Sequence, residues 1–327
     1  MTLAGRATWA GRAWRAGAER RVAGIAAGLG AAAIWGGMYV ASKYVLHYVP
    51  PLTLVLCRLV IGTAALGLLM AATRAPLVRR QDLPLMALLG FVGLFVSMVA
   101  QFAGTRLSTA AGGALITSAT PAFMLLFGWP LLGERPTWLR VGSLALATAG
   151  VAIVALDPAA ARELASGDTA ANGPWPVVPG APDRVVAGNI LLVVAAITWA
   201  LYSVLARIAN RRYPVLVTTC YATGFGALFT GSLVPLELAA QPLAQPLPPM
   251  AWLGLLYLGL VSTAGAFYLW NKSIELLGVG VPSILFFAQP VVGGALGALL
   301  LGERLGASFY LGGALIALAV ALTAREA

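Results

Sequence analysis

One segment of this chain occurs twice, and the duplication limits the available folds more than any other feature. Residues 107–135 recur as residues 276–304, at a constant offset of 169 and without a gap. Both copies contain Ala-x-Pro near the middle, followed by an apolar run that ends in Leu-Leu-Gly-Glu-Arg. Chance does not readily produce such a compound match, so we interpret the chain as an internal duplication of an apolar unit.

Composition indicates the class of protein. Hydrophobic residues make up 60% of the sequence and charged residues only 10%, against about 25% charged in soluble domains. Several apolar runs reach roughly 20 residues, the length that crosses the hydrocarbon core of a bilayer. The two cysteines, Cys57 and Cys220, lie inside these runs, and His47 is the single histidine. We therefore predict a polytopic protein embedded in lipid, without a metal site or a cofactor.

The apolar runs and the breaks between them divide the chain into four parts. Residues 1–21 form a basic tail, residues 22–156 a first repeat, residues 157–185 a connector rich in Pro, Gly and Ala, and residues 186–324 a second repeat. Predicted spanning helices are 22–45, 51–72, 84–103, 108–132 and 138–156, then 186–210, 214–236, 250–270, 278–301 and 307–323. The predicted fold class is an all-α membrane protein with ten transmembrane helices.

The repeat also predicts the orientation of the two halves. At an offset of 164 residues Trp35 falls on Trp199 and Lys43 on Arg207, so the first helices of the halves match as well. Because each half has five spans, the second half must be inverted in the membrane. A cytoplasmic N-terminus places 15 Lys and Arg residues inside and 4 outside. The net charge of +10 is thus a topology signal, with both termini cytoplasmic, and no nucleic-acid partner is expected.

The sequence resembles the EamA family of the drug/metabolite transporter superfamily. The resemblance rests on Trp35-Gly36 with Lys43, on Arg58 in the second helix, and on the two Pro…Leu-Gly-Glu-Arg segments, and it covers about residues 22–323. It implies an inverted-repeat transporter of small molecules in the cytoplasmic (inner) membrane of a bacterium. Helices one, three, four, six, eight and nine would line a central cavity, and helices five and ten would lie at the periphery, where relatives form homodimers. Arg58 has no basic counterpart in the seventh helix.

Aromatic residues occur at unusual depth. Trp35 and Trp199 lie near the middle of their spans, whereas tryptophan is usually enriched at the membrane surface. Both are explained either by core packing or by cavity walls that offer ring faces to a substrate. Tyr39 and Ser203 follow one turn later on the same helix faces.

Proline interrupts the fourth and ninth helices near their middle. Pro121 and Pro290 each leave a carbonyl four residues earlier, at Thr117 and Phe286, without its usual donor. In lipid such a carbonyl requires a hydroxyl, a water or a substrate. Nearby polar side chains at the same depth are Thr120 and Gln289, with Ser262 and Thr263 in the eighth helix.

The charged residues within or beside the spans have structural and functional interpretations. Arg58 would hold a substrate carboxylate or bond to a neighbouring helix as a strut. Lys43 and Arg207 lie near helix ends, where snorkelling to the surface explains them. We interpret Glu134 and Glu303 as acceptors for exposed helix amides rather than as proton relays.

Together with these patterns, the resemblance implies a non-enzymatic transporter that exports small zwitterionic or anionic metabolites, amino acids first, by alternating access. No nucleophile–base pair or acidic metal cluster is evident within the spans. The alternatives are a multidrug or organic-cation exporter and a non-transporting membrane sensor. The predicted substrate contacts are Trp35, Tyr39, Arg58, Thr117, Thr120, Trp199, Ser203, Ser262, Thr263 and Gln289.

Overall fold

A computed structural model describes residues 3–133, 137–156, 182–243, 246–277, 282 and 285–324. Within these ranges the regular structure is helical, with no strand. Seven described helical segments are long and apolar enough to cross a membrane, and three shorter apolar helices accompany them at residues 141–154, 288–301 and 307–319. The chain therefore folds as a multi-pass membrane protein, as the sequence predicts.

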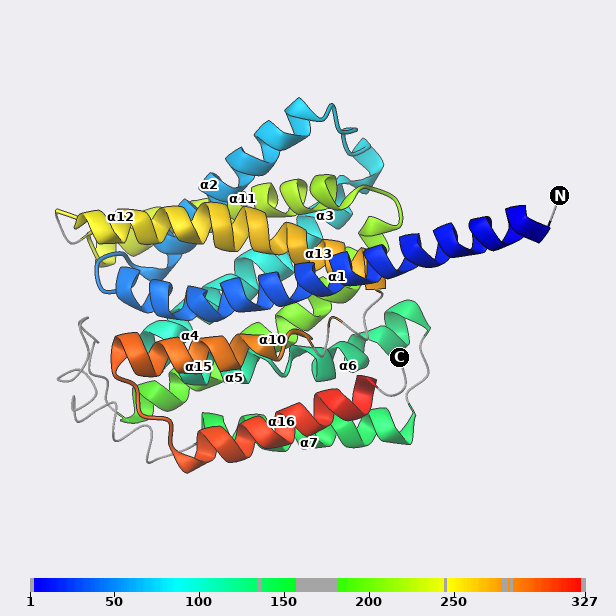
Figure 1. Cartoon of the computed structure of the whole chain (residues 1–327). Coiled ribbons are helices and arrows are strands. Elements are labelled where there is room, and N and C mark those ends of the chain that lie inside the picture. The colour runs from blue at the N-terminus through cyan, green and yellow to red at the C-terminus, as the bar shows by residue number, and fades with distance from the viewer. Residues whose placement is uncertain are drawn as a thin grey trace.

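The first half begins with a helix longer than expected. α1 runs from Leu3 to Val45 and includes most of the predicted basic tail, which extends beyond the bundle in Figure 1. α2 (Pro51–Ala72) has the predicted bounds because proline is favoured in the first helical turn. The third span is built from α3 (Leu83–Leu89), η2 (Gly90–Val96) and α4 (Ser97–Leu107), after the short η1 (Arg80–Asp82).

The predicted span at 108–132 is present as residues 110–132, and next to Pro121 it is divided into α5 (Ala110–Thr117) and α6 (Thr120–Leu132). Pro121 stands in the first turn of α6, where its missing N–H costs nothing. The Thr120 hydroxyl donates to the carbonyl of Thr117 at 2.7 Å, so a hydroxyl satisfies that carbonyl. α6 ends at Gly133, whose φ of 73° is readily adopted only by glycine. α7 (Trp138–Ala155) follows.

The second half repeats this order. Its helices are α10 (Pro182–Asn210), α11 (Val215–Ala240), α12 (Pro249–Leu256), η3 (Tyr257–Gly265), α13 (Ala266–Leu277), α15 (Ala288–Leu301) and α16 (Ala307–Ala324). α10 begins at Pro182, inside the predicted connector, whose residues 157–181 lie outside the described part. Glu134 and residues 278–281, 283 and 284 of the predicted ninth helix also lie outside it.

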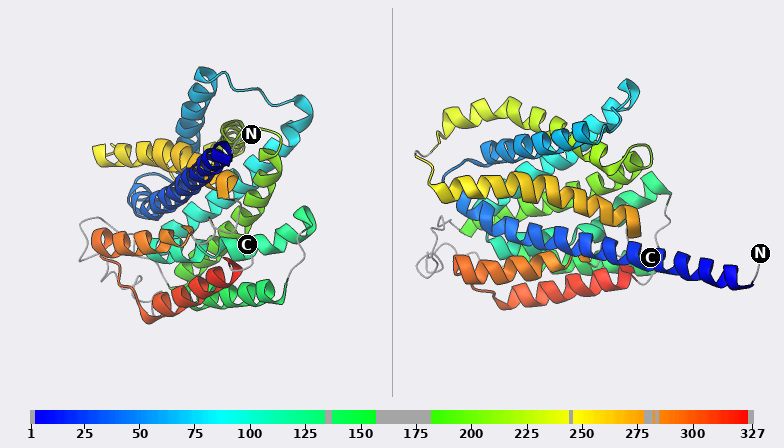
Figure 2. Two further views of the ribbon diagram at one scale, coloured as in Figure 1. Left: turned by 45° about the vertical axis from the view of Figure 1, so that its right-hand side comes forward. Right: turned by 45° about the horizontal axis from the view of Figure 1, so that its top comes forward.

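The helices pack in pairs that the repeat relates. α1 packs against α13 and α15, while α10 packs against α4, α5 and α6. α2 contacts α11, and α7 contacts α16 at the edge of the bundle (Figure 1). At this edge contact Gly150 and Gly312 meet so closely that a Cβ on Gly150 would lie 2.7 Å from the Gly312 carbonyl oxygen. The described ends of the chain emerge at the same end of the bundle in Figure 1 and the right-hand view of Figure 2.

Two π-helical segments occupy repeat-related positions. η2 packs on α11 and α10, and η3 packs on α2 and α1, the corresponding elements of the other half. At the offset of 169 Gly90 in η2 falls on Gly259 in η3. π-helical turns frequently occur at functional sites, because they change which side chains face inward. Here they precede or carry polar side chains at the centre of the bundle, Ser97 after η2 and Ser262 and Thr263 within η3.

Candidate functional site

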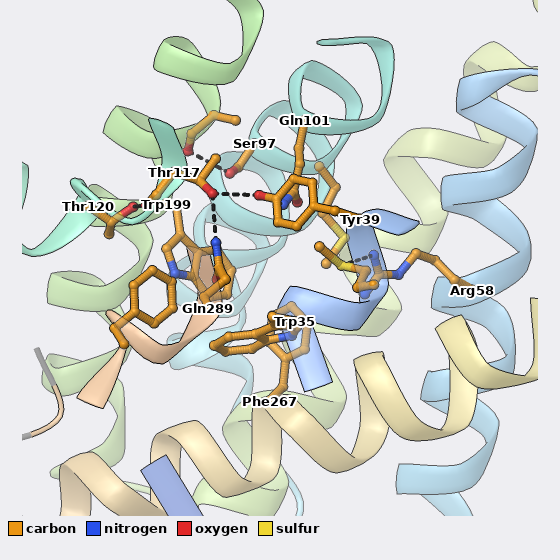
Figure 3. A pocket seen from close by; sticks show the side chains of 14 residues that line it. Trp35, Tyr39, Arg58, Ser97, Gln101, Thr117, Thr120, Trp199, Phe267 and Gln289 are labelled. Atoms are coloured by element: carbon orange, nitrogen blue, oxygen red, sulfur yellow. Dashed lines mark hydrogen bonds between the residues drawn. The ribbon is translucent and has the colours of Figure 1, made fainter. Parts of the chain in front are cut away.

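A cavity lies between the two halves and contains about 400 Å³ of space free of protein atoms, counting the part that opens outward. Its wall combines aromatic rings with a few polar groups from eight helices and the turn before α15 (Figure 3). The lining residues are Trp35, Met38, Tyr39, Arg58, Ser97, Met98, Gln101, Thr117, Thr120, Ala195, Trp199, Phe267, Phe286 and Gln289.

The structure brings seven of the ten predicted contact residues onto this wall. The other three lie behind it: Ser262 and Thr263 bond to Arg58, and the Ser203 hydroxyl donates to the Trp199 carbonyl in its own helix. Sequence reasoning missed Ser97, Gln101 and Phe267. Gln101 carried a usable signal, since it is a side-chain amide inside a predicted span, as Gln289 is.

A hydrogen-bonded chain of side chains forms the polar part of the wall. The Gln101 amide Nε2 donates to the Tyr39 hydroxyl at 2.6 Å, and Tyr39 lies 2.5 Å from the Thr117 hydroxyl (Figure 3). Gln289 Nε2 donates to Thr117 at 2.8 Å and to the Ala114 carbonyl at 3.1 Å. Thr117 in turn donates to the Gly113 carbonyl at 2.8 Å. Because the Thr117 hydroxyl gives its one proton to the Gly113 carbonyl, the Tyr39 hydroxyl is the donor in its bond to Thr117.

The amide oxygens of Gln101 and Gln289 accept no hydrogen bond from the part of the chain that the structure describes. Both amide nitrogens are engaged in the chain of hydrogen bonds, which fixes the orientation of the two side chains. The polar wall can therefore offer two carbonyl oxygens to a donor such as a substrate ammonium group.

Arg58 is fully buried and joins four elements around the cavity. Its Nε donates to the Thr263 hydroxyl at 2.8 Å and its Nη2 to the Ser262 hydroxyl at 3.2 Å. Nη1 contacts the Met38 sulfur at 3.2 Å, and the guanidinium carbon lies 4.9 Å from the centre of the Phe102 ring. These contacts engage three of the five N–H groups that a guanidinium carries.

No carboxylate of the described residues forms an ion pair with Arg58. A guanidinium cannot readily lose its proton, and a buried charge without a counter-charge is costly. Arg58 therefore bridges α2 and η3 through the hydroxyls of Ser262 and Thr263. It also presents an uncompensated positive charge at the cavity wall.

Aromatic rings form the remainder of the wall. The Trp35 ring lies 5.5 Å from Phe267, 5.8 Å from Trp199 and 5.8 Å from Phe286, in edge-to-face arrangements. The Trp35 Nε1 donates to the Ser262 carbonyl at 3.1 Å, which satisfies its one donor. Trp35 and Trp199 therefore pack with the core of the bundle and also line the cavity.

A second charged cluster lies at the junction between α4 and α5. Lys43 is buried, and its Nζ donates to the carbonyls of Thr105 at 3.0 Å, Arg106 at 3.3 Å, and Ser108. The prediction that Lys43 snorkels to the surface is therefore wrong, because the C-terminal carbonyls of α4 lie within its reach. A cation at this end of a helix is also favoured by the helix dipole.

Glu303 binds the other side of the same junction. Its carboxylate accepts from the amides of Ala110 at 2.6 Å and Ala111 at 2.8 Å, the first residues of α5. Burial raises the pKa of the Glu303 carboxyl, while the two amides and Lys43 act to lower it. Glu303 accepts helix amides as predicted, but from α5 rather than from the helix that follows it in sequence.

Together, the helical bundle and its apolar spans define a polytopic membrane protein. The chain belongs to the EamA-like transporter family, whose model matches residues 22–156 and 186–325. It is therefore a multi-pass membrane transporter.

Individual relatives agree with this assignment. A protein from Streptantibioticus cattleyicolor named "Probable terminal-alkyne amino-acid exporter" is 26% identical over 80% of this chain and 79% of its own. The "Probable amino-acid metabolite efflux pump" of Escherichia coli K12 is 27% identical over 86% of this chain and 88% of its own. A solved crystal structure covers 93% of this chain and 97% of its own, with a TM-score of 0.62 and 24% identity, and supports the fold.

Proposed function

We propose that this transporter exports small zwitterionic or anionic metabolites, amino acids first, by alternating access around the central cavity. The observation that carries the proposal is Arg58, a buried cation at the cavity wall with no carboxylate partner among the described residues. A substrate carboxylate would supply the missing counter-charge. Hydrogen bonds between a guanidinium and a carboxylate are stronger than those between two neutral groups.

The rest of the wall complements the other groups of a zwitterion. The amide oxygens of Gln101 and Gln289 would accept from an ammonium group, and the hydroxyls of Tyr39 and Thr117 hold both amides in place. The substrates in the names of the two relatives, amino acids and their metabolites, carry such groups. We assign Trp35 and Trp199 to the apolar wall, Thr120 to the polar wall, and Ser203, Ser262 and Thr263 to supporting positions.

For the membrane arrangement we propose ten spans in two inverted repeats, with both termini on the cytoplasmic side of a bacterial inner membrane. The concentration of Arg and Lys in the loops assigned to that side supports it. α7 and α16 leave large apolar side chains exposed at the periphery, with Trp138 91% and Tyr310 63% accessible. We propose that a homodimer, where one forms, uses this edge.

Two other functions make different predictions. An organic-cation exporter would need a buried acid at the binding site, and no acidic side chain of the described residues lines the cavity. A non-transporting sensor would bind a solute without moving it across the membrane.

A counterflow screen with purified protein in liposomes tests the proposal. Amino acids, sugars and organic cations would each be tested with and without a pH gradient, against liposomes that lack protein. Accelerated exchange of amino acids is the expected result. Exchange confined to organic cations, or binding without any exchange, would exclude the proposed function.

A further inference from the structure

Positions that the repeat relates differ in polarity around the cavity. At the offset of 169 Met98 falls on Phe267 and Thr117 on Phe286, and all four of these residues line the cavity. Ser97 and Gln101 also line it, and they fall on Ala266 and Trp270, which do not. Thr120 falls on Gln289, and this pair is polar in both halves. The cavity therefore has a polar side contributed mainly by α4 and α5 and an apolar side contributed mainly by α13 and the turn before α15.

The two sides are physically separate in the folded chain. Gln101, Ser97 and Thr117 gather on one side of the cavity in Figure 3, while Trp35 and Phe267 lie on the other. Gln289 is the one polar contribution of the second half, and its amide nitrogen points to Thr117 on the polar side. The polarity of the wall therefore follows spatial position more closely than membership of a repeat.

The apolar side is a packed wall rather than an open cage of ring faces. Phe267 lies 5.5 Å from Trp35 and 5.1 Å from Trp199, with interplanar angles of 80° and 83°. Phe286 lies 5.8 Å from Trp35 at 68° and 4.9 Å from Trp270 at 54°. A cage for a cation would instead direct several ring faces toward one empty point. Edge-to-face packing leaves a continuous apolar surface, which suits the carbon skeleton of a substrate.

We infer that the cavity selects amphipathic substrates in a fixed orientation, with the charged head group against the polar side and a large uncharged apolar side chain against Phe267 and Phe286. This inference rests on the proposed function and specifies its substrate class. Phe267 and Phe286 are then specificity-determining residues, because they contact the part of the substrate that differs between amino acids. Arg58, Gln101 and Gln289 contact the part that all amino acids share.

The first test uses the wild-type protein and a series of labelled amino acids in counterflow. Exchange is expected to rise from alanine through valine and leucine to phenylalanine, and to be weakest for lysine and glutamate. A preference for serine, lysine or glutamate over leucine would overturn the inference while leaving amino-acid export intact. Failure to exchange any amino acid would overturn the proposed function, and the inference with it.

The second test compares two substitutions of similar size at Phe267. Phe267→Met places there the residue that its repeat-related position carries, and it keeps the wall apolar. Phe267→Gln places an amide in the same space. The ratio of leucine to alanine exchange is expected to fall about tenfold or more in Phe267→Gln, and much less in Phe267→Met. An equal ratio in both variants would overturn the inference.

A third variant separates selectivity from folding. Phe286→Thr places the residue of its own repeat-related position, Thr117, at the other aromatic site, and its leucine-to-alanine ratio is expected to fall in the same direction. Elution as a single species in detergent identifies the folded variants. The ratio is internal to each preparation, so it does not depend on the amount of active protein. A ratio unchanged in Phe286→Thr as well as in Phe267→Gln would contradict the assignment.

Discussion

The junction between α4 and α5 makes the sharpest stability prediction. Glu303 accepts two backbone amides at 2.6 and 2.8 Å in a site where its side chain is buried. Hydrogen bonds to a charged group contribute about 1.5–3 kcal/mol each, and buried donors left unsatisfied add a cost of their own. Glu303→Ala is therefore expected to lower the free energy of unfolding by about 3–5 kcal/mol. Glu303→Gln keeps one acceptor oxygen for these amides, so it is expected to lower the free energy of unfolding by about half as much.

Thermal unfolding in detergent measures this effect, with Glu275→Gln as the matched control. Glu275 is half-exposed and pairs with Lys272 at 2.7 Å on a helix surface, a kind of pair that contributes only about 0–1 kcal/mol. Lys43→Met removes the side chain that binds the α4 side of the junction. Combined with Glu303→Ala, it should lower the free energy of unfolding by less than the sum of the two separate effects, because Lys43 and Glu303 hold the same short turn. Glu303→Ala with a Tm equal to that of Glu275→Gln would refute the capping role. Loss of proton-driven transport at that unchanged Tm would restore Glu303 as a proton relay.

Three other predictions concern close packing, the hydrogen-bond chain and pH. Gly36→Ala should lower the free energy of unfolding by about 1–3 kcal/mol and impair amino-acid exchange, because the added Cβ would lie 2.7 Å from the Gln289 backbone oxygen. Gly67→Ala is the control, because a Cβ at Gly67 would meet open space. Tyr39→Phe removes the hydroxyl that orders Gln101 and Thr117, so exchange of amino acids should weaken about tenfold or less while Tm changes little; unchanged exchange would contradict this. Because burial raises the pKa of Glu303 in the folded state, the stability that this carboxyl contributes should be greatest in acid and fall as pH rises through that pKa, and this part of the pH dependence should be absent in Glu303→Gln.

Much of the fold follows from local sequence signals. The bounds of α2 were predicted because Pro51 fixes its start and an apolar run of full spanning length follows it. The pairing of α1 with α13 and of α10 with α4 is consistent with the duplication that the 169-residue offset reveals. Pro121 predicts an interruption in the fourth span, but not whether it is a kink or the complete break between α5 and α6, because a proline inside an apolar run can produce either.

The site was less predictable, because it depends on which faces meet. Lys43 lies near the end of α1, and only the packing of α4 beside it turns a surface lysine into a buried donor to three carbonyls. Glu303 likewise caps a helix almost 200 positions earlier in the chain, a contact that no local pattern signals. The π-helical turns that orient Ser97, Ser262 and Thr263 leave no clear trace in the residue types.

The central claim is that Arg58 holds its charge for a substrate carboxylate, and Arg58→Met tests it most directly. Methionine keeps an apolar chain in the buried site and removes the charge. Replacing an uncompensated buried charge by an apolar group is expected to leave the Tm of the substrate-free protein unchanged or raised. The rate of amino-acid counterflow should fall by about ten- to a hundredfold, because that factor corresponds to the loss of one charge-assisted hydrogen bond to the substrate. Normal exchange in Arg58→Met, or a large fall in Tm that a purely structural strut would cause, would contradict the account.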